Sequence, residues 1–270
     1  MDKMYTCING EFVPFEHSYV HVSDLIIQRG FGIFDFFLVK EGVPAYISYH
    51  LDRFIKSAVL MNLELAWTKE ELTGMVIRLT EKNAINNSSV KIMLTGGISN
   101  DDFTLLPGKS TLIIINKPFE IKLPEAWKNG GCLITANYQR EIPEAKTINY
   151  IRSVKLSRKL MEESIAEVLY ISRKWVRECS RSNIFCVKDG IVYTPKSNIL
   201  EGVTRRRILE SEGYNLQVKD FKISDLLAAD EVFITSTTKG VLPVIKIDSH
   251  VIADGRIGAV TKAVLKLIMG

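Results

Sequence analysis

Short apolar runs separated by turn dipeptides dominate the beginning of the chain. The runs TCI and EFV flank Asn9-Gly10, and the runs FFLV and PAYI flank Glu41-Gly42. Such pairs between strand-like runs favour tight hairpins, because asparagine and glycine accept the positive φ that these turns need. We therefore predict two β-hairpins near the N-terminus.

Apolar residues at three- and four-residue spacing then predict two helices. The first covers about residues 49–63, and Arg53 falls beside its apolar stripe. The second begins at Thr68, because Thr68 and Glu71 match the Thr-x-x-Glu capping box. Two strand-like runs, VKIMLTG and TLIIINK, follow, so this part of the chain is predicted to mix α and β structure.

A stretch without clear periodicity divides the chain. Residues 118–131 contain two prolines and paired glycines, a composition typical of a connector. We expect a small N-terminal domain over 1–117, an interdomain connector over 118–130 and a larger C-terminal domain over 131–270. In the last of these, the pattern predicts strands at CLITANY, EVLYIS and EVFITS, helices over about 148–163 and after Gly202, a hairpin at Asp189-Gly190 and a final helix after Gly255.

Composition and charge narrow the classes of function. The formal charge of +4 comes from 35 basic and 31 acidic residues scattered along the chain, without the clustered basic stripe of nucleic-acid-binding proteins. No stretch approaches the ~20 apolar residues of a membrane span, and the first residues lack a leader-like apolar run, so we expect a cytoplasmic protein. The four cysteines have no metal-ligand spacing, which favours reduced thiols and no metal site.

Four motifs in the second half of the chain carry candidate chemistry. They are AKTINY at 145–150, ECSRSNIF at 178–185, ILEGVTR at 199–205 and ADEVFITSTTKGVLPV at 229–244. Together with the early segments GFGIFDFF and HLDRF, they resemble the class IV (fold type IV) aminotransferases that depend on pyridoxal 5'-phosphate (PLP). This group contains branched-chain aminotransferase, D-amino acid aminotransferase and aminodeoxychorismate lyase. The resemblance implies an α+β, two-domain D-amino acid aminotransferase-like fold, with a small N-terminal α/β domain and a larger C-terminal β-barrel-like domain that binds PLP.

The resemblance gives Lys146 the central role. Taken alone, it is one of many lysines, which are mostly exposed. By the resemblance, it holds the cofactor aldehyde as a Schiff base and later, as a neutral amine, moves the α-proton of the substrate. Glu178 would face the pyridine nitrogen and keep it protonated, although alone it is typical of a solvated strand end. Tyr150 would hydrogen-bond the phenolic oxygen of the cofactor, and Leu200 would pack on a ring face.

The resemblance also implies a set of phosphate donors. Gly202, Val203 and Thr204 stand at the start of an apparent helix, whose first N–H groups favour an anion. Arg53 would add a permanent charge with bidentate geometry. Alone, Thr204 fits a helix cap and Arg53 a surface cation. The remaining cofactor contacts implied by the motifs are Ser182, Asn183, Ser236 and Thr237.

The implied substrate contacts depart from two family patterns. D-amino acid aminotransferases hold the substrate carboxylate with an arginine where this chain has Gly96, and branched-chain enzymes use an arginine where it has Leu38. Alternating apolar residues around Phe34 can wall a pocket for a hydrophobic side chain or belong to the core. We expect substrate contacts from Phe34, Thr95 and Thr238, with the carboxylate held by backbone N–H groups near Thr237 and Thr238.

The activity implied by these features is a ping-pong transfer of an amino group from an amino acid of the branched-chain type to 2-oxoglutarate. Three alternatives stay open: a D-amino acid aminotransferase, an aminodeoxychorismate lyase, and a non-catalytic binding protein that keeps the fold. The expected partners are small amino acids and 2-oxo acids, with no nucleic acid and no membrane. By the resemblance, we expect a homodimer in which residues near Phe34 or at 99–103 reach across.

Overall fold

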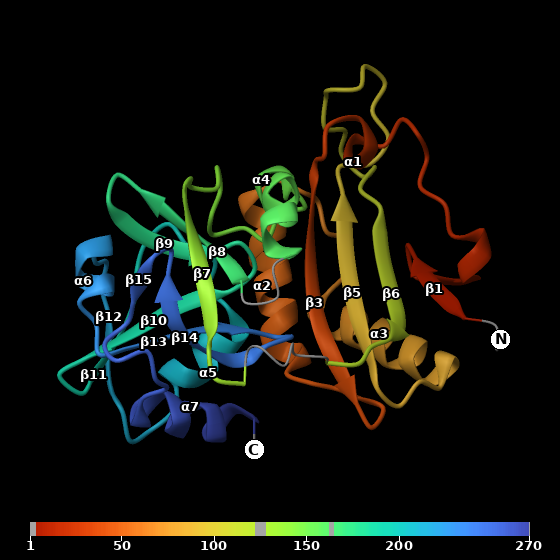
Figure 1. Ribbon diagram of the computed structural model, residues 1–270. Coiled ribbons are helices and arrows are strands. Elements are labelled where there is room, and N and C mark those ends of the chain that lie inside the picture. The colour runs from red at the N-terminus through yellow and green to blue at the C-terminus, as the bar shows by residue number, and fades with distance from the viewer. Residues whose placement is uncertain (1–3, 122–127, 162–164, 270) are drawn as a thin grey trace. The chain divides into compact units, whose positions relative to one another are not determined.

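The chain folds into two compact units. The computed structural model describes residues 4–121, 128–161 and 165–269. Unit 1 takes in Met1–Glu120 and Glu144–Tyr150, and unit 2 takes in Ile121–Pro143 and Ile151–Gly270 (Figure 1). The segment with Lys146 therefore belongs to unit 1, although the sequence prediction placed it in the C-terminal domain. The predicted connector lies partly outside the described residues, at 122–127, and the limits of functional domains stay a prediction.

Unit 1 is built on a six-stranded antiparallel sheet with the order β2-β1-β6-β5-β3-β4 (Figure 1). Its strands are β1 (Tyr5–Ile8), β2 (Glu11–Pro14), β3 (Gly32–Lys40), β4 (Val43–Pro44), β5 (Ser88–Thr95) and β6 (Leu112–Pro118). Both predicted hairpins are confirmed, with positive φ at Asn9, Gly10, Glu41 and Gly42. The second is shorter than predicted, because β4 ends just before the left-handed Tyr46 that starts the next helix.

Two long helices of unit 1 share one hydrophobic core with one face of this sheet. They are α2 (Ile47–Leu60) and α3 (Lys69–Asn83), and the shorter elements are η1 (Phe15–His17) and α1 (Leu25–Gln28). Phe37 of β3, Phe54 of α2 and Leu72 of α3 are fully buried in this core. The capping box at the start of α3 is confirmed. Helix α2 begins and ends two to three residues earlier than predicted.

Unit 2 is built on a nine-stranded mixed sheet with the order β12-β11-β10-β13-β14-β7-β8-β9, and β15 pairs with β14. Its strands are β7 (Gly131–Asn137), β8 (Ile165–Ser172), β9 (Trp175–Cys179), β10 (Asn183–Lys188), β11 (Ile191–Thr194), β12 (Asn215–Val218), β13 (Glu231–Ser236), β14 (Gly240–Ile247) and β15 (His250–Val251). Strand β7 pairs in parallel with both β8 and β14. The three predicted strands are confirmed as β7, β8 and β13, and the predicted hairpin joins β10 to β11.

The helices of unit 2 are short except for the last. They are α4 (Ile151–Leu156), η3 (Ser157–Met161), α5 (Val203–Leu209), α6 (Ile223–Leu227) and α7 (Ala259–Met269). The helix predicted over 148–163 starts later, because Ile148 donates its N–H to the Gly32 carbonyl of β3 instead. Residues 162–164 lie outside the described part of the chain. Both units mix helices with sheet, which confirms the predicted α+β class, and no helix in the described ranges is long and apolar enough to cross a membrane.

Candidate active site

Lys146 lies on the edge of β3 in unit 1. Its carbonyl accepts a hydrogen bond from the Phe34 N–H (2.9 Å). Its own N–H donates to the hydroxyl oxygen of Ser57 on α2 (3.0 Å), and that hydroxyl donates to the carbonyl of Arg53 (2.8 Å). A strand and a helix therefore both fix the backbone from which the half-buried Lys146 side chain starts.

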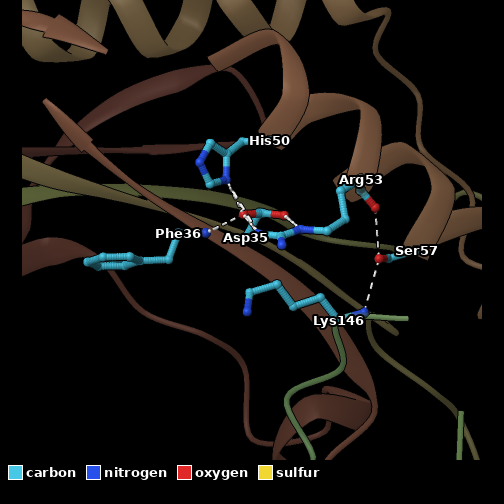
Figure 2. A network of polar contacts seen from close by, with 6 residues as sticks. All are labelled: Asp35, Phe36, His50, Arg53, Ser57 and Lys146. Carbon is cyan, nitrogen blue, oxygen red and sulfur yellow. Dashed lines mark hydrogen bonds and ion pairs between the residues drawn. The ribbon is translucent and has the colours of Figure 1, made fainter. Parts of the chain in front are cut away.

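A buried ion cluster lies beside Lys146 (Figure 2). The Asp35 carboxylate accepts hydrogen bonds from Nε and Nη2 of Arg53 (both 2.8 Å), from the Phe36 N–H (2.7 Å) and from His50 Nδ1 (2.8 Å). Burial raises the pKa of Asp35, but the charge and hydrogen bonds of Arg53 outweigh it and hold this pKa well below its usual range. Burial lowers the pKa of His50 despite the opposing pull of Asp35. The pairing fixes the plane of the Arg53 guanidinium.

Phe34 lies on the opposite face of β3, where two amines and a second aromatic ring surround it. Lys146 Nζ lies 4.6 Å and Lys91 Nζ 5.0 Å from the centre of the Phe34 ring, and the Tyr150 ring centre lies 5.7 Å away. Lys91 is half-buried on β5, and burial lowers its pKa. Among the described residues, no carboxylate forms an ion pair with Lys91.

In unit 2, both oxygens of the buried Glu178 are engaged. Oε1 accepts a hydrogen bond from Arg140 Nε, and Oε2 accepts one from the Leu200 N–H (2.8 and 2.9 Å). The Leu200 carbonyl in turn accepts from the side-chain amide of Asn183 (2.7 Å). A Cβ at position 202 would lie 2.0 Å from Asn183 Oδ1, so a larger residue there would displace the Asn183 side chain that holds Leu200. Asn183 and Leu200, two predicted residues from separate segments, therefore lie close to the Glu178 carboxylate.

The other predicted residues of unit 2 lie at the ends of elements. Val203 and Thr204 open α5, whose N-cap Gly202 provides no side-chain cap. Ser236 ends β13, and Thr237 and Thr238 lie in the turn that leads to β14. Within the ranges that the structure describes, no three His, Cys, Asp or Glu side chains gather in a way that could hold a metal ion.

A family model described as amino-transferase class IV matches residues 32–247. That span contains Lys146, the Glu178 carboxylate with its partners, and the turn at 236–238. This chain is a class IV aminotransferase. This match, together with the aminotransferase relatives that follow, confirms the predicted family, PLP as the cofactor and the enzyme class of transaminase.

Curated relatives and solved structures support the same family. The aminotransferase is 31% identical to the D-alanine aminotransferase of Staphylococcus epidermidis over 97% of this chain and 95% of the relative. It is 30% identical to that of Listeria monocytogenes over 96% and 92%. Its fold is similar to the branched-chain amino acid aminotransferase of T.th. with pyridoxamine 5'-phosphate, at a TM-score of 0.88 and 26% identity over 100% and 94% of the two chains. The Escherichia coli branched-chain enzyme, at 23% identity over 100% and 94%, shares the fold at a TM-score of 0.87.

The donor groups of this aminotransferase fit PLP in each unit taken separately. Unit 1 offers the amine of Lys146 and the oriented guanidinium of Arg53, groups that suit an aldehyde and a phosphate. Unit 2 offers the buried Glu178 carboxylate and, at Thr204 and Thr237, the hydroxyl groups of the predicted phosphate set. These groups are complementary to the aldehyde, pyridine nitrogen and phosphate of the cofactor.

Thr95 and Gly96 show how tightly the predicted substrate segment is packed. The Thr95 side chain is fully buried, and its hydroxyl donates to Asp24 (2.7 Å) and accepts from the Gly97 N–H (3.0 Å). A Cβ at Gly96 would lie 2.9 Å from Leu25 Cβ. An arginine at 96 would therefore require this segment to rearrange, and the role of Thr95 in substrate binding stays a prediction.

Sequence reasoning missed Asp35, Arg140 and Lys91 as members of these groups. Asp35 had a visible signal, since a single carboxylate interrupts the apolar run GIFDFFLV and a buried carboxylate needs a charged partner. Arg140 and Lys91 carried no such signal, because their partners come from distant segments.

Proposed function

We propose that Lys146 of this transaminase bonds covalently to the PLP aldehyde and moves the α-proton of the substrate. The observation that carries the proposal is the fixed backbone of Lys146 on the β3 edge, with its amine 4.6 Å from the Phe34 ring. The bound cofactor supplies a sink for the electrons released at the α-carbon. A lysine anchored in this way can bring the same nitrogen to bond formation and to proton transfer.

We further propose that Glu178 faces the pyridine nitrogen of the cofactor. Arg140 and the Leu200 N–H each donate a hydrogen bond to one of its oxygens, and these contacts fix the plane of the carboxylate. A carboxylate oxygen can accept more than one hydrogen bond, so the same group can also accept from a protonated ring nitrogen. The phosphate is proposed to be bound by Arg53, Gly202, Val203, Thr204, Ser236 and Thr237, with further cofactor contacts from Tyr150, Ser182, Asn183 and Leu200.

For the amino donor, we propose a branched-chain amino acid, with 2-oxoglutarate as acceptor. Phe34 and Phe36 are half-buried on the face of β3 that Lys146 and Lys91 contact, which supports an apolar pocket. A specific observation favours a second candidate, D-alanine. The curated relatives at 30–31% identity are named D-alanine aminotransferases, so D-alanine is tested alongside leucine.

Lys91 is proposed to bind the substrate carboxylate. Gly96 packs against Leu25 where D-amino acid aminotransferases carry an arginine, so this position supplies no cation for the substrate carboxylate. Lys91 offers a cation near the same aromatic ring as Lys146, and no acidic side chain of the described residues neutralises it. A half-buried ammonium without a carboxylate partner favours an anionic ligand.

The role of Lys146 is tested by its absorbance with PLP. The wild type with added PLP should show the visible band of lysine-bound cofactor. Lys146→Ala should lack that band and all turnover, whereas Lys40→Ala, an exposed lysine at the end of β3, should keep both. A visible band and turnover that persist in Lys146→Ala would contradict the proposal.

The donor is tested by the rate at which bound PLP converts to its amine form. Leucine, isoleucine, valine and glutamate in the L-form are compared with D-alanine. Fast conversion by L-leucine supports the first candidate, and conversion by D-alanine alone supports the second. Pyruvate release from aminodeoxychorismate without amino transfer to 2-oxoglutarate would assign the lyase activity instead.

We also propose that the enzyme is a homodimer. Exposed apolar side chains support this, because Val22, Ile27, Ile98 and Phe103 of unit 1 are 43–78% exposed. Size-exclusion chromatography with light scattering should give twice the chain mass. A fully active monomer would contradict the proposal.

A further inference from the structure

Glu167 on β8 is a fully buried carboxylate with several donors around it in unit 2. Its Oε1 accepts from Lys239 Nζ (2.6 Å) and lies 3.4 Å from Arg181 Nε, and its Oε2 accepts from the Ser180 hydroxyl. The Ser182 hydroxyl lies 3.5 Å from Oε1. Burial raises the pKa of Glu167, but Lys239 and Arg181 outweigh it and keep this pKa below its usual value.

These donors come from two segments that the proposed function assigns to the cofactor. Ser180, Arg181 and Ser182 form the loop that follows Glu178, between β9 and β10. Lys239 ends the turn after β13 that carries the proposed phosphate contacts at 236–237. One carboxylate therefore connects the segment of the pyridine-nitrogen partner with the segment of phosphate donors.

Inside the turn at 236–239, the polar contacts are longer than the contact between Lys239 and Glu167. The Lys239 N–H donates to the Ser236 hydroxyl at 3.2 Å, and the hydroxyls of Ser236 and Thr238 lie 3.5 Å apart. By contrast, the Lys239 ammonium is 2.6 Å from Glu167 and is almost completely buried. Charge-assisted contacts of this length are the stronger kind, so the ion pair adds a firm side-chain contact to a turn whose ends are already paired at Ser236 and Gly240.

We propose that Glu167 and Lys239 are positioning residues that hold the 236–238 turn in the arrangement that binds the cofactor phosphate. This inference rests on the proposed function. It goes beyond it because neither residue was assigned to the site, and because both act through the turn rather than by touching the cofactor.

The inference is tested by cofactor binding to the apoenzyme, with PLP and with pyridoxal, which lacks the phosphate. Lys239→Met should weaken PLP binding at least tenfold and leave pyridoxal binding within about twofold of the wild type. The matched control is Lys188→Met, because Lys188 forms an exposed ion pair with Asp230 in the same unit. It should bind both compounds as the wild type does.

A second variant separates positioning from folding. Lys239→Met leaves the Glu167 charge without its nearest partner, so the double variant Glu167→Gln/Lys239→Met removes the charge as well. The double variant should recover thermal stability of the apoenzyme toward the wild-type value while PLP binding stays at least tenfold weaker. Recovery of PLP binding together with stability would overturn the inference, as would an equal loss of PLP and pyridoxal binding. A wild-type apoenzyme that binds no PLP would overturn the proposed function and this inference with it.

Discussion

Asp35 and Arg53 form a buried ion pair inside unit 1. Asp35 has no exposed surface and receives two hydrogen bonds from Arg53, so removing its charge deprives a nearly buried guanidinium of the carboxylate it pairs with. Breaking a buried ion pair at one end costs more than the pair contributes as a whole.

We therefore expect Asp35→Asn to lower the free energy of unfolding by about 3–5 kcal/mol at pH 7. The control is Asp52→Asn on the same helix as Arg53, since Asp52 pairs with Lys69 at the surface and its loss should cost less than about 1 kcal/mol. Urea denaturation followed by circular dichroism measures both. Equal effects of the two substitutions would contradict the buried pair.

The same pair predicts a dependence on pH. Because the pKa of Asp35 is lower in the folded than in the unfolded chain, its stabilisation is complete above the ordinary carboxyl pKa of about 4 and is lost as the pH falls toward the folded value. The stability difference between wild type and Asp35→Asn should therefore shrink from about pH 4 downward. Denaturation at several pH values checks this, and a difference that grows in acid would show the opposite sign.

Lys91→Met tests the proposed carboxylate contact. Removal of the charge should raise KM for the amino donor by about tenfold or more, as expected for a lost charged hydrogen bond, while the visible band of the bound cofactor stays. Lys82→Met is the control, because Lys82 also lies over an aromatic ring, that of Tyr5, but at the far end of α3. An unchanged KM in Lys91→Met would remove Lys91 from the substrate pocket.

Among single residues, the sequence selects as candidates those that lie within recognisable motifs and misses those that distant partners define. Lys146 and Glu178 could be selected because motif neighbours accompany them. Arg140 lies only six residues before Lys146, yet its contact with Glu178 depends on the pairing of β7 with β8 and of β8 with β9, which no local pattern encodes. Lys91 looks in the sequence like any other lysine on a strand, and only the register of β3 with β5 shows that it lies opposite Phe36.

At the scale of elements, the start of α3 is the clearest case in which local sequence fixes structure. Thr68 accepts from the Glu71 N–H (3.2 Å), and Glu71 accepts from the Thr68 N–H (2.8 Å). Both contacts are between residues three apart, so no tertiary information is needed to predict them. The segment at 144–150 is the contrary case, because β3 takes its backbone hydrogen bonds and delays the predicted helix until Ile151.

We expect Thr68→Ala to destabilise the protein by about 1 kcal/mol through loss of the N-cap. Thr73→Ala is the control within the same helix, because the Thr73 hydroxyl only donates back to the Lys69 carbonyl (2.8 Å) and alanine favours the helix. Thermal or urea denaturation compares them. A smaller effect at Thr68 than at Thr73 would show that the cap contributes nothing.

At the scale of the whole molecule, the reactivity of the four cysteines measures how well the folded chain keeps solvent from its interior. All are free, and Cys7, Cys179 and Cys186 are buried, whereas Cys132 is partly exposed. Burial raises the pKa of Cys186 to about 12 and that of Cys179 well above its usual value, so neither thiol forms the reactive thiolate at neutral pH. The native protein should react with a thiol reagent at Cys132 alone, and with all four after unfolding. Rapid reaction of further thiols would indicate opening of either unit.

The chain passes between the two units three times, and this limits where it can be cut into two fragments that reassemble. The backbone passes from one unit to the other at 120/121, 143/144 and 150/151, so seven residues that include Lys146 return to the first unit after a strand of the second. A break at 120 would separate the amine from the strand edge that fixes it, and neither fragment would hold a complete copy of the first unit. A break after residue 150 would keep the first unit whole but leave β7 of the second unit on the first fragment, so reconstitution from two polypeptides would have to rebuild the pairs of β7 with β8 and β14.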